Sequence, residues 1–284
     1  MEKAKSISTS FGKFGNSLAS IGKILLQSKW NIHIPTASKD EEIVVLGNGP
    51  SLNDTIQNHS DFLKGRTLLA VNFSANAPVF FDLKPNYYVL ADPHFFSGTE
   101  HDNVKNLWDN LSKATWKLTI FVPTKAALST SILSQIKNNT NLSIVRYNLT
   151  PIEGFDWLED LSYSRGLGMP RPRNVLIPSL MLALRMNFKT IYVAGADHSW
   201  TKTITVNEQN QVISIQPHFY KEDDKELKRI DTEYMHYPFH QILYSFYVAF
   251  KSYFTIQRFA VKQGAKIWNI TKGSFIDAFP RKEI

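Results

Sequence analysis

The sequence predicts an α/β fold: a single Rossmann-like domain with a mostly parallel sheet, preceded by an N-terminal amphipathic helix and interrupted by a lid-like segment. Three observations predict it. Short, continuously apolar runs alternate with helix-like stretches, which is typical of a sheet that helices cover on both faces. The first of these runs leads through a glycine-rich turn into a helical pattern. The chain has 284 residues, 43% of them hydrophobic, enough for one substantial core or two modest ones.

The basic charge of the chain lies in its first segment. We divide the sequence into a leader, residues 1–39, and an α/β domain, residues 40–284. The leader has six Lys and one acidic residue, so it carries +5 of the net charge of +7 and leaves the domain nearly balanced. Because the basic excess lies in the leader rather than on an aromatic-lined face, we expect no nucleic-acid partner.

The leader has the pattern of an amphipathic helix. Its apolar residues recur at steps of three and four and therefore share one helix face: Phe11, Phe14, Leu18, Ile21 and Leu25. Such a helix can lie in an anionic membrane surface through residues 11–26. It can equally pack on the domain or on a second subunit of a homo-oligomer. These alternatives stay open from the sequence.

The sequence predicts neither a secretory signal nor a membrane span. Lys23 interrupts the apolar stretch of the leader, and no uncharged apolar run reaches 18 residues. The chain has no Cys, which excludes thiolate metal sites and thiol nucleophiles and fits a reducing compartment. We therefore expect a cytoplasmic protein, peripheral on the inner face of the cytoplasmic membrane if the leader binds lipid.

The domain alternates predicted strands with predicted helices. Seven apolar runs indicate strands: 43–46, 68–73, 87–91, 118–122, 142–147, 191–194 and 266–270. Helix-like patterns lie between or after them: 51–63, 104–114, 125–137, 177–187 and a long aromatic helix at 238–263, which opens with Pro238 and closes at Gly264. This alternation is typical of βα units in a parallel sheet.

Two segments depart from that rhythm. Residues 149–174 carry Gly, Pro and three Arg with little periodicity, and we expect a functional loop there. Residues 198–235 begin with two alternating runs about a turn at 207–210, which predicts a hairpin, and then become strongly charged. We interpret this second segment as a mobile, lid-like excursion.

The first strand ends in a turn that can bind phosphate. The turn reads Gly47-Asn48-Gly49-Pro50-Ser51, and a helical pattern starts at Pro50 or Ser51. We expect Gly47 and Gly49 to allow close backbone approach and unusual dihedral angles, and the helix N-terminus to present free N–H groups to an anion. The alternative is a tight turn capped by Ser51, but an Asn between two glycines has no evident packing purpose.

This turn resembles the opening motif of the bacterial sialyltransferases of glycosyltransferase family 42. It is also similar to that of the related MptE-like superfamily with the domain of unknown function 115, which includes flagellin glycosyltransferases and archaeal pterin diphosphokinases. Further similarities follow the ends of later strands, at Asn72, at Asp92-Pro93 and at Gly195-Ala196-Asp197, with a weaker one over 266–274. The resemblance implies the GT-A-variant form of the Rossmann-like fold.

The resemblance implies a site for a CMP-sugar. The candidate nucleotide-sugar-binding residues are Gly47, Asn48, Gly49, Pro50, Ser51, Asn72, Asp92, Pro93, Arg173, Asn174, Gly195, Asp197, Ser199 and Ser274. The family's Asn-Pro is Asp92-Pro93 here, which adds a negative charge near a phosphate. Its phosphate-supporting tyrosine aligns with Ser199, so Tyr220 or Tyr234 would have to substitute.

The family's general base is a His that follows the Gly-x-Asp motif. Here His236 and His240 compete for that role. Physical reasoning favours His240, because a helix that opens at Pro238 places it in the first turn, where the helix dipole disfavours imidazolium. The alternative for either is a solvated or structural histidine.

We expect no metal and no cofactor. His198 and His218 lack the spacing of a zinc site, and Pro238 separates the only His-x-x-x-His pair. The sequence thus predicts a metal-independent, inverting glycosyltransferase that passes an acidic, sialic-acid-like sugar from a CMP-sugar to a glycan or glycolipid, in the synthesis of capsule or lipopolysaccharide. One alternative is a diphosphokinase whose magnesium Asp92 and Asp197 hold. Another is a nucleotide- or glycan-binding module without turnover.

Overall fold

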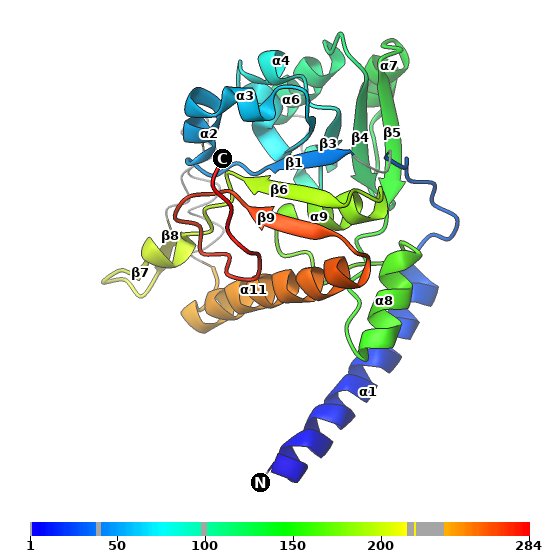
Figure 1. Ribbon diagram of the computed structural model, residues 1–284, viewed down its shortest axis with the longest axis vertical. Helices are drawn as coiled ribbons and strands as arrows, with labels where there is room; N and C mark the ends of the chain where they lie inside the picture. The colour runs from blue at the N-terminus through cyan, green and yellow to red at the C-terminus, as the bar shows by residue number, and fades with distance from the viewer. Residues whose placement is uncertain (1, 38–40, 98–100, 215–218, 220–235) are drawn as a thin grey trace.

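The computed structural model describes residues 2–37, 41–97, 101–214, 219 and 236–284 (Figure 1). The described chain folds around a parallel sheet with the strand order β5-β4-β3-β2-β1-β6-β9. Its strands are β1 (Glu42–Leu46), β2 (Thr67–Val71), β3 (Tyr87–Val89), β4 (Leu118–Pro123), β5 (Leu142–Tyr147), β6 (Thr190–Ala194) and β9 (Lys266–Asn269). Every strand predicted from an apolar run is present, so the predicted α/β fold is confirmed.

The sheet has a topological switch point at β1, because the strands that follow it in the chain are added first on one side of β1 and then on the other. Strands β2 to β5 follow one another on one side of β1, whereas β6 and β9 lie on the other side. Val45 of β1 is paired with Leu69 of β2 and with Val193 of β6, all in parallel register. In such sheets the loops after the two strands at the switch point diverge and leave a crevice at the carboxyl ends. The turn after β1 opens at this crevice.

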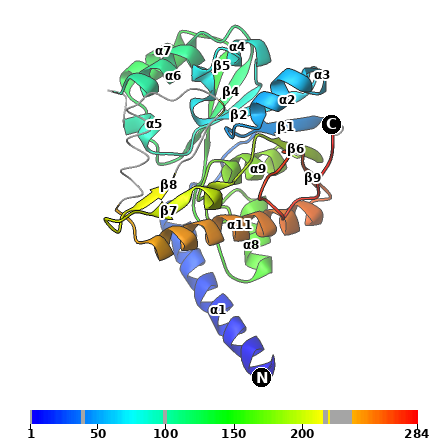
Figure 2. The ribbon, with the colours of Figure 1, turned by 90° about the vertical axis from the view of Figure 1, so that its left-hand side faces the viewer.

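Helices cover both faces of the sheet (Figures 1 and 2). Alternate residues of β1 show the division: Val44 packs with Leu52 beneath α2, whereas Val45 packs with Leu180 beneath α9. The first layer has α2 (Leu52–Asn58), α3 (Ser60–Leu63), α4 (Phe80–Leu83), α6 (Asp102–Ser112) and α7 (Thr130–Lys137). The second has α8 (Asp156–Ser164), α9 (Leu176–Arg185) and α11 (Phe239–Lys262). Shorter turns are η1 (Asn72–Asn76), α5 (His94–Ser97) and η2 (Trp200–Lys202).

The segment 149–174 is more regular than the sequence predicts. It contains α8, whose Leu158 and Tyr163 are buried. The expectation of a loop was therefore wrong for its central part. Asp160 lies on the same helix and pairs with Arg258 of α11 at 2.9 Å. A charged residue therefore stands on the buried face of α8, where an amphipathic pattern would have an apolar one.

The segment 198–235 begins with the predicted hairpin. Strands β7 (Ile204–Val206) and β8 (Val212–Ser214) pair antiparallel across the predicted turn. The charged remainder of the lid-like excursion, at 215–218 and 220–235, lies outside the described residues.

The leader forms one long helix, α1 (Glu2–Gln27), which projects from the body (Figure 1). Its docked face carries the buried Ile24 and two small polar residues: the Ser20 hydroxyl donates to the Glu153 carbonyl at 2.7 Å and accepts from the Glu153 N–H at 2.9 Å. Ser17 accepts from the Phe155 N–H at 2.9 Å. The predicted apolar face points away, with Phe14 and Leu18 both 55% exposed.

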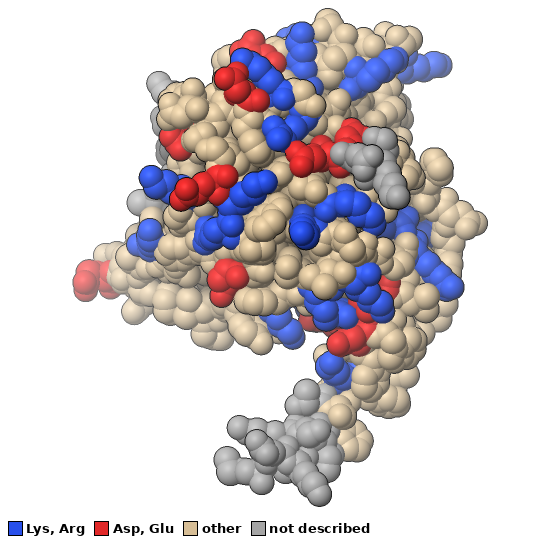
Figure 3. Space-filling view, viewed as in Figure 1, with Lys and Arg blue, Asp and Glu red and all other residues tan. Residues whose placement is uncertain are grey.

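Two further features concern membrane contact: the distribution of surface charge and the length and apolarity of the helices. On the face that Figure 3 shows, charges of both signs are interspersed over the body, whereas the described part of α1 is mostly uncharged. No helix in the described ranges is long and apolar enough to span a bilayer.

Candidate functional site

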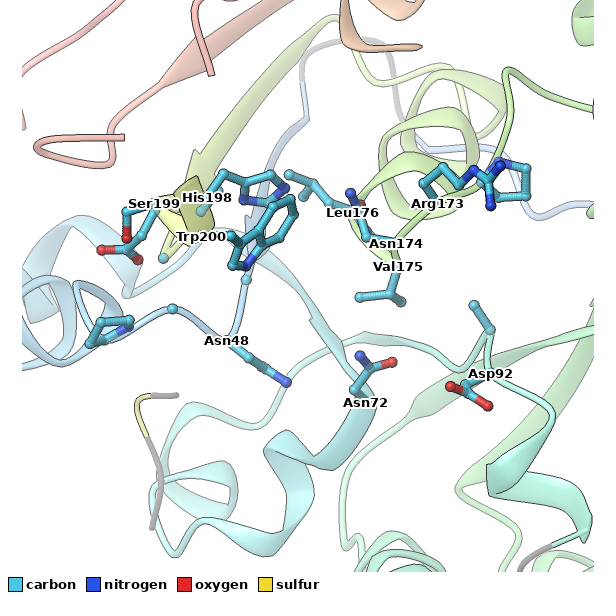
Figure 4. Close-up of a pocket in the computed structure, with 18 of the residues that line it drawn as sticks. Asn48, Asn72, Asp92, Arg173, Asn174, Val175, Leu176, His198, Ser199 and Trp200 are labelled. Atoms are coloured by element: carbon cyan, nitrogen blue, oxygen red, sulfur yellow. The ribbon is translucent and has the colours of Figure 1, made fainter. Parts of the chain in front are cut away.

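A cavity of about 570 Å³ opens at the carboxyl ends of β1, β2 and β6. Its lining includes Gly47, Asn48, Gly49, Pro50, Asn72, Asp92, Pro93, Arg173, Asn174, Gly195, Asp197 and Ser199. These are all of the predicted nucleotide-sugar-binding residues except Ser51 and Ser274. Figure 4 shows Asn48, Asn72 and Asp92 on one side, facing His198, Trp200 and Asn174 on the other. The volume lies within the range of sites for small molecules.

The glycines bring two loops together. The Gly47 N–H donates to the Ala194 carbonyl and the Gly49 N–H to the Gly195 carbonyl, both at 2.8 Å. A Cβ at Gly47 would lie 2.4 Å from the Gly195 oxygen, and one at Gly49 would lie 1.9 Å from Asp197 Oδ2. Close approach is therefore the reason for both glycines. The expectation of unusual dihedral angles was wrong for them and holds instead for Gly195, whose φ is 64°.

Fewer N–H groups of the turn after β1 are free to bind phosphate than the sequence predicts. The N–H groups of Gly47 and Gly49 are occupied by the loop after β6, and those of Leu52 and Asn53 by Gly49 and Pro50. Within the described residues, the N–H groups of Asn48 and Ser51 keep no backbone partner. The Ser51 side chain does not cap α2 but donates to Asp197 Oδ2 at 2.7 Å. Ser51 thus orients a carboxylate of the cavity wall.

Asn48 has a packing purpose that the sequence does not reveal. Its Nδ2 donates to the Val71 carbonyl at 3.3 Å, and its Oδ1 accepts from the Ser74 hydroxyl at 2.7 Å. Both partners lie where β2 ends, so Asn48 ties the turn after β1 to the next strand.

Two buried amide atoms at the cavity wall lack partners in the described structure: Asn72 Oδ1 and Asn174 Nδ2. Asn174 Oδ1 accepts from the Leu176 N–H and from the Tyr253 hydroxyl, both at 3.0 Å, so its Nδ2 is the atom left to donate. Asn72 has a φ of 49°, which Asn tolerates better than most residues. Buried polar atoms are normally hydrogen-bonded, so a ligand that accepts from Asn174 and donates to Asn72 would complete the wall.

One basic side chain is free at the cavity. Among the described residues, three charged side chains line it: Asp92, Asp197 and Arg173. Arg171 instead pairs with Glu153 at 2.5 Å, and Arg165 does not line the cavity. Arg173 has no ion-pair partner in the described structure, which leaves its guanidinium free to bind an anion.

His198 and Trp200 line the cavity, although the sequence assigned them no role. His198 Nε2 lies 2.5 Å from the Tyr253 hydroxyl, and the Trp200 ring covers the imidazole at 4.2 Å between centroids. Burial lowers the pKa of His198 to about 3, so the ring is neutral at physiological pH. Its position directly after Asp197 is the signal that could have indicated it.

The two histidines predicted as catalytic bases do not line the cavity. His236 precedes α11, and His240 lies in its first turn, as predicted; both are exposed. Phe246, farther along the same helix, packs its ring 5.3 Å from that of Trp200. α11 therefore contacts the cavity wall at Phe246, about two turns beyond the first residue of the helix. Tyr220 and Tyr234 lie outside the described residues.

Ser274 lies behind the wall. It is buried, donates to the Ala196 carbonyl at 2.6 Å and accepts from Asn269 Nδ2 at 3.1 Å, so it supports the loop after β6. Within the described ranges, no group of three or more His and carboxylate side chains has an arrangement that could hold a metal ion. Asp92 and Asp197 remain as a pair of acids on the cavity wall, and the predicted metal independence stays a prediction.

Comparison with known proteins identifies the chain. The family described as 6-hydroxymethylpterin diphosphokinase MptE-like matches residues 16–203, about two thirds of the sequence. The chain belongs to the MptE-like family. The match starts within α1 and covers the turn after β1 and the loop after β6, the two sides of the cavity. All of the described residues that line the cavity thus lie inside the matched range.

The fold of this MptE-like protein also occurs in a solved structure. The MAf glycosyltransferase from Magnetospirillum magneticum AMB-1 superposes with a TM-score of 0.50 at 11% identity. The match covers 96% of this chain and 38% of that protein, so the chain spans about two fifths of its length. At this identity the similarity establishes the fold. No curated protein sequence matches the chain.

Proposed function

We propose that this MptE-like protein is a glycosyltransferase that moves an acidic, sialic-acid-like sugar from a CMP-sugar to a glycan or glycolipid in cell-surface polysaccharide synthesis. The observation that carries the proposal is the cavity at the switch point, which gathers nearly all of the predicted donor-binding residues. Two facts support transfer of a sugar: the chain belongs to the MptE-like family, and a solved structure with this fold is a glycosyltransferase.

The cavity residues divide the work of binding such a donor. Arg173 offers a bidentate guanidinium to the phosphate or to the carboxylate of an acidic sugar. The N–H groups of Asn48 and Ser51 add donors for the phosphate oxygens. Asn72 and Asn174 provide one acceptor and one donor for the base or the ribose. The base that we propose for the acceptor hydroxyl is His240, which lies outside the cavity lining, exposed in the first turn of α11.

The rival activity is the diphosphokinase after which the family is described. It would use Asp92 and Asp197 to hold magnesium on a nucleoside triphosphate. The test is a thermal-shift titration with CMP, UDP, GDP and ATP, each in EDTA or in magnesium. A ligand at 100 times its Kd adds about 2.7 kcal/mol of stability. Stabilisation by CMP in EDTA is the expected result, and stabilisation by ATP and magnesium alone would refute the proposal.

Arg173→Ala should weaken CMP-sugar binding by about 10- to 100-fold, because a hydrogen bond to a charged group contributes about 1.5–3 kcal/mol. Arg173→Lys should recover part of the affinity, since Lys keeps the charge but not the fork. Isothermal titration with CMP-N-acetylneuraminate measures both. Arg165→Ala is the matched control, because Arg165 is exposed and does not line the cavity. Equal affinity of the Arg173→Ala variant and the parent protein would remove Arg173 from the site.

We also propose that the exposed apolar face of α1 lies in an anionic membrane surface. That face is exposed along the helix, with Phe14 and Leu18 both 55% and Leu25 68% exposed, and 10–30 contains no acidic residue. The triple substitution Phe14→Ser, Leu18→Ser and Leu25→Ser should abolish sedimentation with phosphatidylglycerol vesicles.

The docked serine face is untouched in that variant, so Tm should stay within about 2 °C of the parent value. Leu133→Ser, at an exposed position of α7, is the matched control and should sediment normally. Undiminished vesicle binding of the triple variant would contradict the membrane assignment.

A further inference from the structure

A second cavity, of about 430 Å³, lies beside the first. It is lined by Gln27, Ala91, Pro93, Phe96, Ser97, Pro123, Thr124, Lys125, Ala126, Ala127, Leu149 and Thr150. Three of these residues, Ala91, Pro93 and Leu149, also line the first cavity. A molecule in the second cavity would therefore lie against the same wall as the donor.

The lining of the second cavity suits an apolar group. Most of its side chains are apolar, including the buried Phe96. Its two threonine hydroxyls already have partners: Thr124 donates to Asn148 Oδ1 at 3.2 Å, and Thr150 lies 2.9 Å from the Ser28 hydroxyl. Lys125 is exposed and is the one charged side chain among the described lining residues. A nucleotide or a free sugar would lose its water there with few partners in return.

The second cavity also touches the end of α1. Gln27, the last residue of α1, lines it, and the preceding Leu26 is 87% exposed. The hydrogen bond between Ser28 and Thr150 fixes the helix end against the cavity wall. The end of α1 therefore borders the second cavity.

We infer that the second cavity holds the apolar aglycone of an amphiphilic acceptor, such as the lipid portion of a glycolipid, and presents its sugar hydroxyl to the donor cavity. The inference rests on the proposed function, and it adds the acceptor class and its subsite. The geometry supports it in two ways: the shared wall keeps donor and acceptor within reach of each other, and the lining favours an alkyl chain over a polar head.

The test is isothermal titration with n-octyl β-D-glucopyranoside below its critical micelle concentration. We expect saturable binding by the parent protein and none with methyl β-D-glucopyranoside, which lacks the chain. Ala127→Trp places an indole at the cavity lining and should weaken octyl glucoside binding at least 10-fold, whereas Ala127→Ser should bind within about twofold of the parent. Ser97→Trp, at another exposed lining position, is the second variant if Ala127→Trp does not fold.

Two controls separate the possible failures. The triple serine variant of α1 should retain octyl glucoside binding, which excludes adsorption to the outer face of the helix. CMP titrations on the same samples report on the donor cavity. Unaltered octyl glucoside binding by both tryptophan variants, or none by the parent, overturns the inference even where CMP still binds. Octyl glucoside binding that Ala127→Trp blocks, together with no CMP binding, supports the second cavity as an apolar site and refutes the proposed donor.

Discussion

Gly47→Ala is expected to destabilise the protein by about 3 kcal/mol, because overpacking a tight site costs about 1–3 kcal/mol and sometimes more. The added Cβ would lie 2.4 Å from the carbonyl oxygen of Gly195, a backbone atom that cannot swing aside as a side chain would. Relief requires that the loops after β1 and β6 separate, which breaks the hydrogen bond from the Gly47 N–H to Ala194. Since each kcal/mol shifts Tm by about 2–4 °C in a chain of this size class, Tm should fall by about 6–12 °C.

The same variant should lose stabilisation by CMP, because the two loops that separate form opposite sides of the donor cavity. Thermal unfolding with and without CMP measures both effects. Gly12→Ala is the matched control: a Cβ there meets no atom within 4 Å, and Ala favours the helix, so Tm should not fall. A Tm for Gly47→Ala within about 1 °C of the parent value would show that the turn has room for a side chain.

The sheet was predictable because its signal is local. Each buried strand is a short apolar run, and each run is long enough to be recognised without knowledge of its neighbours. α8 was missed for the opposite reason. Its Asp160 is 7% exposed and acceptable there because Arg258 and Lys262, about a hundred positions later in the chain, pair with it. A buried charge looks like a surface residue until its partners are known.

The leader helix illustrates a related limit. The sequence correctly indicates an apolar face, and the usual expectation is that such a face meets the body. The structure docks a neighbouring face, which buries Ile24 and bonds Ser17 and Ser20 to the backbone before α8. Short hydroxyl side chains permit close approach and satisfy buried N–H and C=O groups, which an apolar face cannot do. The sequence pattern of the helix alone does not show that the backbone groups of Glu153 and Phe155 will be the hydrogen-bond partners of those hydroxyls.

The cavity lining was predictable from position in the chain, but the roles of its members were not. Residues after strand ends converge at the switch point of a parallel sheet, and this places Asn72, Asp92 and Asp197 together. The need for a glycine at position 49 comes from Asp197, which lies 148 positions later and whose Oδ2 would be 1.9 Å from an added Cβ. Ser274 belongs to the same loop cluster yet faces away from the cavity, since its hydroxyl bonds to Ala196 and Asn269. Sequence position brings residues near a site without fixing where their side chains point.

His240→Ala is expected to lower kcat by about 100-fold or more, since a positioned general base typically contributes 10²–10⁴-fold. CMP binding should not change, because His240 lies in the first turn of α11 and does not line the donor cavity. His236→Ala should keep kcat within a few-fold of the parent value, because His236 precedes α11. The measurement is release of CMP from CMP-N-acetylneuraminate in the presence of octyl β-D-galactopyranoside.

The competing base is His198, whose ring already lines the donor cavity. Burial lowers its pKa to about 3 and its Nε2 lies 2.5 Å from the Tyr253 hydroxyl, so it is a weak proton acceptor that is already engaged. Loss of turnover in His198→Gln with unchanged CMP binding, while His240→Ala stays active, would transfer the role of base to His198. Full activity of both the His236→Ala and His240→Ala variants, each folded, would remove the start of α11 from the mechanism. The contact of Phe246 with Trp200 would then only brace the cavity wall, at 5.3 Å between the rings.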